Sequence, residues 1–362
     1  MARIVLDARE VRALGRGERL RALLHRLPRL APEHVFVALV APADVIGFGR
    51  SISGVEAVAI GAGPGSLRER FELGRVLRRA GADLLDATPL SVARAGGLGF
   101  VTTATEPHAA DLRRSKSVLE GIRAGRGALL VPSRAAATDL ARGLDLPIER
   151  LRVVQPSVTL SGADGGAAGE IANAAFLRRV GLPGTFVLAF GEEAENPDID
   201  LIWQAIAPLA ELALAVVFRG RPSALVETRL EGAGAVRQRV RLLGEVSDRE
   251  LGMLLRRAAG VVATGDSWSW PDGVLRALAT GVPVVAARSG GLPELVGEAG
   301  LLVPPGAVDP LRSSLYSTAL AAGPADRERM AVRSRERAAR FGWERGAREV
   351  LASYQAVLGG QA

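Results

Sequence analysis

The side chains in this sequence that could do chemistry are mainly arginines and carboxylates. The chain has no cysteine, and His25, His34 and His108 are its only histidines. Without cysteine, disulfides and thiolate metal sites are excluded. The three histidines are scattered, so they do not have the spacing of a zinc site and give little support to a Ser-His-Asp triad. We therefore expect no metal ion.

The stretch Asp266–Val285, DSWSWPDGVLRALATGVPVV, carries the most informative pattern. It resembles the signature E-G-F-x-x-x-x-L-E-A-x-A-x-G-x-P-V-V of the group 1 family of nucleotide-sugar glycosyltransferases. The positions that fit are Leu275, Ala277, Ala279, Gly281, Pro283, Val284 and Val285. In that family the two glutamates hold the donor sugar and the nucleotide ribose, and here their positions hold Trp268 and Arg276. Trp268 could stack on a sugar or pack within its loop, and Arg276 could grip a phosphate.

Further matches run through most of the chain in the family's order. RIVLDAR, followed by Gly15 and Gly17, resembles the family's first strand and glycine loop. Three other matches are VPSRAAATDL at 131–140, LPIERLRVVQPSV at 146–158 and VRLLGEVSDRELGMLLRRAAGVVATG at 240–265. Gly290, Gly291 and Glu294 belong to GGLPELVGEAGLLVPPG, whose glycines suit a tight turn. The resemblance implies an α/β fold with two Rossmann-like domains facing across a cleft, the GT-B type.

The family also has an arginine and a lysine that hold the donor diphosphate. Cations there stabilise the charge that develops in a retaining transfer as the glycosidic bond breaks. The matching segment is Gly191–Asn196, GEEAEN, with Glu192 at the arginine position and Glu195 at the lysine position. A carboxylate about 4 Å from a phosphate charge costs roughly 1–4 kcal/mol at effective dielectrics of about 80 to 20. We expect weak diphosphate binding, unless Arg219 and Arg221 supply substitute cations.

On the acceptor side the family often carries a His-Asp pair after its Val-Val-Thr strand. The matching segment here is VTTATEPH at 101–108, with Thr105 at the histidine position and Glu106 at the aspartate position. His108 follows shortly after. It is either a substitute catalytic group or an ordinary surface histidine.

Apolar runs predict the elements that would position these residues. Strand-like runs alternate with helical patterns, which is typical of parallel α/β architecture. The expected strands are Arg3–Leu6, Val35–Ala41, Ala57–Ile60, Leu84–Asp86, Phe100–Thr103, Ala128–Val131, Leu151–Val154, Phe186–Phe190, Ala213–Phe218, Val240–Leu243, Gly260–Ala263 and Val282–Ala286. The expected helices include Glu18–Leu27, Leu67–Arg79, Asp200–Leu209, Asp248–Arg257, Gly273–Thr280 and Glu344–Leu358. Ser247 and Glu250 have the spacing of a capping box.

Composition favours two domains with a linker. We expect an N-terminal acceptor-side domain over 1–160, a linker over 161–175 and a nucleotide-side domain over 176–340. SGADGGAAG at 161–169 has the small, flexible composition of a linker. Residues 341–362 are expected to form a C-terminal helix that packs back on the N-terminal domain.

Charge divides unevenly along the chain. Residues 1–165 carry 24 basic and 17 acidic side chains, and residues 166–362 carry 22 of each. This excess suggests an anionic partner, either a membrane surface or a protein, or else a solvated arginine-rich face. The helix Leu67–Arg79 is either a membrane-surface helix or a helix packed on the sheet. The candidate contact residues are Arg68, Arg75, Arg78, Arg79, Arg113, Arg114 and Lys116.

Nucleic acid is not expected, because only 4% of residues are aromatic and no basic-aromatic interleaving occurs. No apolar run reaches the length of a membrane span, and the N-terminus has no signal-peptide order. We expect a cytoplasmic protein, either free or peripheral at the inner membrane face.

Two functions remain open at this stage. The first is hexosyl transfer from a nucleotide-sugar to a glycan, lipid-linked or small-molecule acceptor, as the resemblance implies. The second is a non-catalytic relative that serves as a partner, regulator or glycan-binding protein, as the replaced donor-site residues suggest.

Overall fold

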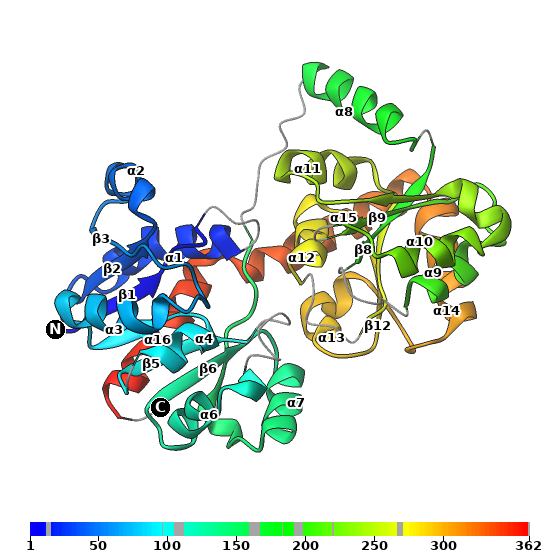
Figure 1. Ribbon diagram of the computed structural model, residues 1–362. Coiled ribbons are helices and arrows are strands. Elements are labelled where there is room, and N and C mark those ends of the chain that lie inside the picture. The colour runs from blue at the N-terminus through cyan, green and yellow to red at the C-terminus, as the bar shows by residue number, and fades with distance from the viewer. Residues whose placement is uncertain are drawn as a thin grey trace. The chain divides into compact units, whose positions relative to one another are not determined.

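The computed structural model describes residues 1–11, 16–95, 97–104, 112–158, 167–182, 184–191, 198–218, 221–265 and 271–360 (Figure 1). The chain forms two compact units. The first comprises Met1–Ser157 together with Trp343–Ala362, and the second comprises Val158–Gly342. Each unit is built on a parallel sheet covered by helices, so the predicted α/β fold class is confirmed.

The sheet of the first unit has seven parallel strands. They are β1 (Arg3–Asp7), β2 (Val35–Val40), β3 (Val55–Ala59), β4 (Leu84–Asp86), β5 (Gly99–Thr103), β6 (Gly127–Val131) and β7 (Leu151–Val153). Their order in the sheet is β3-β2-β1-β4-β5-β6-β7. The chain therefore reverses its direction of winding between β1 and β4. This position is the topological switch point, where sheets of this kind bind ligands at the carboxyl ends of their strands.

Helices cover both faces of this sheet. They are α1 (Arg16–Leu30), α2 (Val45–Ser51), α3 (Glu69–Ala80), α4 (Pro89–Arg94), α6 (Lys116–Arg123), α7 (Arg134–Leu144) and α16 (Trp343–Leu358). The C-terminal helix α16 contacts α1 and strands β4 to β6. Its Ala347, Val350 and Tyr354 are buried in the same apolar cluster as Leu23 and Phe36. On α3's side of the sheet, α4 contacts both α3 and α6.

The segment 67–79, for which a membrane-surface helix and a helix packed on the sheet were both open, packs on the sheet along only part of its length. Leu73 and Leu77 are buried, whereas Leu67 is 81% exposed and Phe71 is 75% exposed. The helix turns Leu73 inward, and it also buries the carboxylate of Glu69. Two large apolar side chains therefore remain in solvent at its N-terminal end.

The second unit repeats the same architecture with six parallel strands. They are β8 (Phe186–Gly191), β9 (Ala213–Phe218), β10 (Val240–Leu243), β11 (Gly260–Ala263), β12 (Val284–Ala287) and β13 (Leu301–Val303), in the order β10-β9-β8-β11-β12-β13. The helices are α8 (Ala167–Arg179), α9 (Asp198–Ile206), α10 (Ala224–Glu231), α11 (Asp248–Arg257), α12 (Pro271–Thr280), α13 (Leu292–Val296), α14 (Val308–Leu315) and α15 (Pro324–Ala338). The switch point here lies between β8 and β11.

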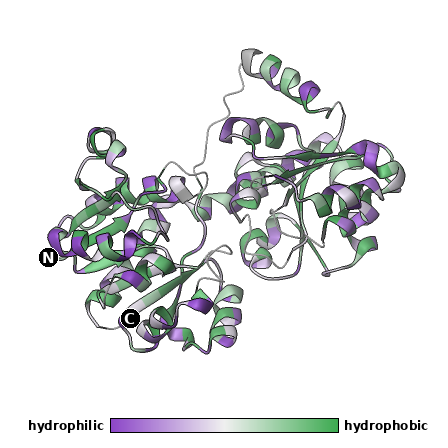
Figure 2. Ribbon diagram, in the orientation of Figure 1, coloured by the Kyte–Doolittle hydropathy of each residue, from purple (hydrophilic) through white to green (hydrophobic). Residues whose placement is uncertain are grey.

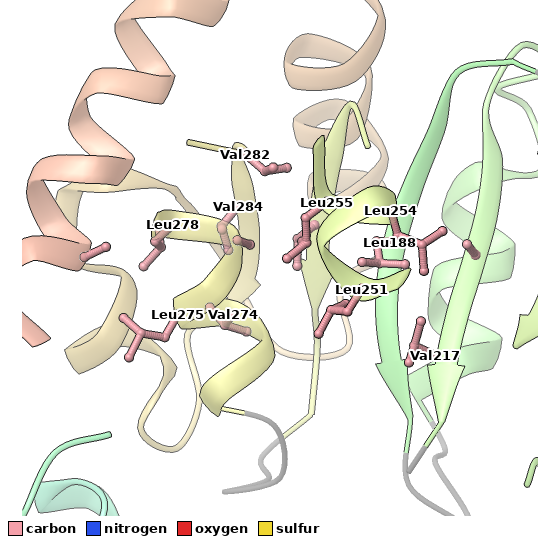
Figure 3. Packing of buried hydrophobic residues seen from close by; sticks show 14 of the residues in the cluster. Leu188, Val217, Leu251, Leu254, Leu255, Val274, Leu275, Leu278, Val282 and Val284 are labelled. Carbon is pink, nitrogen blue, oxygen red and sulfur yellow. The ribbon is translucent and has the colours of Figure 1, made fainter. Parts of the chain in front are cut away.

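Strand residues alternate between two apolar cores, one on each face of this sheet. Leu188 and Val217 point toward α11 and α12, where they join Leu254 and Leu275 (Figure 3). Their strand neighbours point to the opposite face, where they pack against α9 and α14. The strands are correspondingly hydrophobic, whereas the helices carry both polar and apolar residues (Figure 2).

One helix boundary was predicted correctly from its local sequence. The capping box at the start of α11 is confirmed, with both reciprocal hydrogen bonds between Ser247 and Glu250. The linker prediction over 161–175 is wrong in its second part, because residues from Ala167 onward form α8. This helix is held by burial of Phe176 and Leu177 in the core. Strand β13 was absent from the predicted set.

Candidate functional site

The carboxyl edge of the second sheet brings several predicted site residues together. Helix α12 follows β11, and its first turn packs directly on the end of β8. A Cβ at Gly273 would lie 2.7 Å from the Phe190 ring, and a Cβ at Gly191 would lie 2.6 Å from the Phe218 ring. Real Cβ atoms do not approach so closely, so these glycines are required by packing. They place the N-terminus of α12 at the switch point.

Arg276 replaces the second signature glutamate and has a carboxylate partner. Its Nη1 lies 2.9 Å from Oδ1 of Asp248, the first residue of α11, and its side chain is 21% exposed. The positive charge at this position is thus balanced by a neighbouring helix. Sequence inspection alone did not pair the two residues.

The glycine turn after β12 has the conformation that its sequence suggests. Gly290 has φ of +52°, in the left-handed region that favours glycine, and Gly291 caps the short helix α13. The Ser289 hydroxyl donates to the Gly265 carbonyl at 3.3 Å, which links this turn to the end of β11. The carbonyl oxygen of Glu294 accepts a hydrogen bond from the guanidinium of Arg337 on α15. The turn is therefore fixed on both sides.

Two exposed arginines stand at this edge within the described residues. Arg221 follows β9 and Arg288 follows β12. Arg288 was not among the predicted site residues, although its place directly before the glycine turn could have suggested it. Four predicted donor-side residues, Glu192, Glu195, Arg219 and Trp268, lie outside the described residues.

The carboxyl edge of the first sheet holds a cluster of buried charges. We call it the Glu69 cluster; it consists of Asp7, Arg9, Glu69, Ser91 and Arg94. The Arg9 guanidinium lies 2.5 Å from carboxylate oxygens of both Asp7 and Glu69. Oε1 of Glu69 also accepts from the Ser91 hydroxyl at 2.6 Å, and Oε2 lies 2.6 Å from Nη1 of Arg94. Two cations and two anions therefore meet at the β1–β4 switch point.

This cluster holds the glycine-rich loop 61–66, GAGPGS, which joins β3 to α3. Arg9 donates to the Ala62 carbonyl at 2.8 Å. Arg94 donates to the Gly65 carbonyl at 2.9 Å and to the Ser66 carbonyl at 2.7 Å. The Gly65 amide donates to Glu69 at 2.8 Å. The loop is thus held through its backbone, at both carbonyl and amide groups.

The charge states in the cluster follow from these contacts. Burial acts to raise the pKa of Glu69, but the hydrogen bonds from Ser91 and Arg9, the Arg9 charge and the Gly65 amide lower it below its ordinary value. Burial acts to lower the pKa of Arg9, and the hydrogen bonds and charges of Asp7 and Glu69 raise it above its ordinary value. Both groups are therefore ionised and paired near neutral pH.

A second buried acid lies beside this cluster. The Tyr354 hydroxyl on α16 donates to Oδ2 of Asp86, at the end of β4, at 2.5 Å. Burial raises the pKa of Asp86, while the Arg19 charge and the Tyr354 hydrogen bond lower it, and the Asp7 charge adds to the rise. Burial and Asp86 together raise the pKa of Tyr354. This pair connects the C-terminal helix to the switch point.

Of the predicted acceptor-side residues, only Gly17 lies within the part of the chain that the structure describes. Gly17 is a position where a Cβ would lie 2.3 Å from the Val11 carbonyl oxygen, so glycine is required by that close approach. Gly15, Thr105, Glu106 and His108 lie outside the described residues.

Sequence reasoning missed the Glu69 cluster, whose members lie on segments far apart in the chain, from Asp7 to Arg94. Its one local signal is an acidic residue in the first turn of a basic helix.

Neither a metal site nor a membrane span is found among the described residues. No group of three or more histidines and carboxylates there could hold a metal ion. No helix in that part of the chain is long and apolar enough to cross a bilayer.

Comparison with known proteins points to one family. Residues 185–317 match the family model described as Glycosyl transferases group 1. A relative named D-inositol 3-phosphate glycosyltransferase, from Xylanimonas cellulosilytica, is 32% identical over 244 residues, covering 65% of this chain and 58% of the relative. The chain thus spans less than two thirds of that relative's length.

Solved structures share the two-domain fold. A glycosyltransferase from Rickettsia africae has a TM-score of 0.73 at 13% identity, covering 99% of this chain and 98% of that chain. Anabaena HepE in complex with UDP and glucose has a TM-score of 0.69 at 15% identity, covering 98% of this chain and 100% of that chain. At these identities the likeness concerns the fold, which is the GT-B fold.

Proposed function

We propose that this chain, a member of the group 1 glycosyltransferase family, transfers a hexose from a nucleotide-sugar to a hydroxyl acceptor with retention of anomeric configuration. The family match over residues 185–317 carries this proposal. It is supported by the packing of α12 and the glycine turn at the carboxyl edge of the second sheet, where such folds bind nucleotides.

The donor diphosphate is assigned to cations that differ from the family's usual pair. Arg221 and Arg288 are exposed at the ends of β9 and β12, and an arginine fork suits phosphate oxygens. In place of the usual arginine and lysine stand Glu192 and Glu195. Each carboxylate would cost about 1–4 kcal/mol if it lay about 4 Å from a phosphate charge. The rebuilt site is therefore expected to bind diphosphates weakly.

The acceptor is proposed to be a hydroxyl compound that carries a phosphate. Relatives with the inositol phosphate name act on such a compound, and residues 1–165 have a net positive charge. A phosphorylated polyol and a lipid-linked phosphate share this chemistry. Assays with each type of acceptor distinguish the two sources.

Calorimetric titration with UDP, GDP and ADP tests the donor site. We expect at least one of them to bind, and Arg288→Ala and Arg221→Ala to weaken that binding. Arg333→Ala, at an exposed arginine on α15, is the matched control and should bind as the wild type does. The double variant Glu192→Arg/Glu195→Lys should bind more tightly. If no diphosphate binds and no nucleotide-sugar is consumed, the transferase proposal fails and the non-catalytic alternative is favoured.

We further propose that the first unit docks on an anionic membrane surface. Leu67 and Phe71 are exposed at the N-terminal end of α3, beside the exposed Arg68 and Arg70. Arg113, Arg114 and Lys116 are exposed at the start of α6. Because helices in a parallel α/β unit begin at the carboxyl edge of the sheet, both groups lie on that edge. Apolar side chains ringed by cations match a bilayer with anionic headgroups.

Vesicle co-sedimentation tests this docking surface. We expect binding to phosphatidylglycerol vesicles but not to phosphatidylcholine vesicles, with a steep loss between low and physiological salt, where screening acts over about 8 Å. Leu67→Ser/Phe71→Ser and Arg113→Glu/Arg114→Glu should each weaken it. Ile171→Ser and Arg333→Glu, at exposed positions of the second unit, are the controls. Absence of vesicle binding, with salt-sensitive capture of a protein instead, would assign the surface to a protein partner.

A further inference from the structure

We propose that Glu69 is a positioning residue for the acceptor. Through Arg9, Ser91 and Arg94 it fixes the loop 61–66, and the fixed loop sets where the acceptor lies at the carboxyl edge of the first sheet. The inference rests on the proposed transferase function, because it assigns acceptor binding to this unit.

The segments that meet at Glu69 all lie at the carboxyl edge of the first sheet. Arg9 follows β1, loop 61–66 follows β3, and Ser91 and Arg94 stand on α4 directly after β4. Strands β1 and β4 are neighbours in the sheet and flank its switch point. A group that ties these segments together therefore controls the backbone at the position where this fold binds ligands.

The loop has little means of holding its own shape. Three of its six residues are glycines, and its single polar side chain, Ser66, donates to the Gly63 carbonyl at 2.8 Å. Gly65 has φ of +77°. Glycines have large conformational freedom in the unfolded chain, so a fixed conformation has to be imposed by contacts from outside the loop. The Glu69 cluster supplies most of those contacts, and Glu72 adds one by accepting a hydrogen bond from the Gly61 amide at 2.8 Å.

Glu69 cannot act on a substrate directly. Its side chain is 0% exposed, and each of its two carboxylate oxygens already accepts two hydrogen bonds. The positive charges of Arg9 and Arg94 balance the negative charges of Glu69 and Asp7 within the cluster. Its influence on a ligand must therefore pass through the backbone that it holds.

The loop presents open space on its outer side. Gly63 is exposed, and a Cβ at that position would meet nothing within 4 Å. The Ala62 and Gly65 carbonyls are occupied by arginines from behind. A ligand can therefore approach the loop closely, and a shift of the loop would move its contact surface.

Conservative variants test this role without removing the buried carboxylate. Arg94→Lys keeps the charge beside Glu69 but replaces the guanidinium fork, whose two nitrogens reach the Gly65 and Ser66 carbonyls separately, with a single ammonium group. Ser91→Ala removes a donor to Glu69 at a position that is 0% exposed. Arg3→Lys is the matched control, because Arg3 likewise binds a carbonyl and a glutamate, at the amino edge of the same sheet. Glu69→Gln is included only if it folds.

Two measurements are made on each full-length variant. Hydrogen–deuterium exchange reports on the amides of loop 61–66, and steady-state kinetics reports KM for the acceptor separately from kcat and from donor binding. For Arg94→Lys and Ser91→Ala we expect faster loop exchange and a rise of about five- to tenfold in acceptor KM, with kcat and donor affinity nearly unchanged. For Arg3→Lys we expect wild-type loop exchange and wild-type KM.

The outcomes separate this inference from the proposed function. If the wild type transfers sugar, and loop exchange rises while acceptor KM stays constant, the loop does not position the acceptor and only this inference is overturned. Unchanged loop exchange in both variants also overturns it, because the cluster would then not fix the loop. If the wild type transfers nothing to any acceptor, the proposed function falls, and this inference falls with it.

Discussion

Replacing Tyr354 by phenylalanine would remove one buried hydrogen bond and leave the packing of its ring intact. Tyr354 is 0% exposed and Asp86 is 7% exposed, and the hydroxyl donates to the carboxylate at 2.5 Å. The phenylalanine ring fills the same space in the core between α16 and the sheet. The variant therefore removes one hydrogen-bond donor to the buried Asp86 carboxylate and leaves the packing unchanged.

The expected loss follows from the charge of the acceptor. A hydrogen bond to a charged group contributes about 1.5–3 kcal/mol. For a domain of about 150–250 residues, each kcal/mol lowers the melting temperature by about 2–4 °C. A loss of about 2 kcal/mol should thus lower the transition of the first unit by about 4–8 °C at a pH where Asp86 is ionised.

The loss should depend on pH in a defined direction. Burial raises the pKa of Asp86 in the folded protein, and the Tyr354 hydrogen bond opposes that rise. A group with a raised folded pKa contributes stability that is present below its unfolded pKa, about 3.9 for aspartate, and lost as pH rises through the folded value. Removal of the hydroxyl raises the folded pKa further, so the variant loses more stability than the wild type as pH rises.

Chemical denaturation between pH 4 and 8, followed by circular dichroism and calorimetry, measures this difference. The same substitution is made in an Asp86→Asn background to complete a double-mutant cycle. We expect the loss to grow with pH when Asp86 is present, and to be smaller and independent of pH in the Asp86→Asn background. An equal loss at every pH, or the same loss in both backgrounds, would refute the reasoning from a buried carboxylate.

Other substitutions test the remaining structural arguments. Gly273→Ala should destabilise the second unit by about 1–3 kcal/mol because its Cβ would strike the Phe190 ring, and urea titration against Gly252→Ala, which meets only a flexible arginine tip, checks this. Ser247→Ala should cost about 1 kcal/mol by the same assay because α11 loses its capping box. Because the folded pKa of Glu69 is lowered, the stability that it contributes above the ordinary glutamate pKa of about 4.3 should be lost as pH falls through the folded value. The stability of the first unit is measured during acid titration, with Arg3→Lys as control. Full stability of the unit below pH 3 would contradict this prediction.

The amino-acid sequence determined the elements and the fold class. Four strands, Leu84–Asp86, Ala213–Phe218, Val240–Leu243 and Gly260–Ala263, have the bounds that their apolar runs predict. The start of α11 follows from a Ser247 cap with its acidic partner three residues later. These features depend on neighbours within a few positions, and local pattern therefore suffices to predict them.

Local pattern failed where burial was decided by distant parts of the chain. The small residues before Ala172 are typical of a linker, yet α8 forms because Phe176 and Leu177 enter the core of the second unit. The pattern of residues 67–79 left open whether the helix packs on the sheet or lies on a membrane surface, and the structure buries Leu77 while it leaves Leu67 and Phe71 exposed. In each case the helix pattern was compatible with more than one face, and the neighbouring elements selected which face was buried.

The candidate site shows most clearly which features follow from the local sequence and which depend on distant parts of the chain. The glycine turn at Gly290 could be identified from the sequence, because left-handed backbone favours glycine wherever it occurs. The pairing of Arg276 with Asp248, and the meeting of Arg9, Glu69 and Arg94, could not. Sequence determined that these charges exist. Only the tertiary structure decided their partners, because a charge–charge contact depends on distance in space, and the order of strands in each sheet sets that distance.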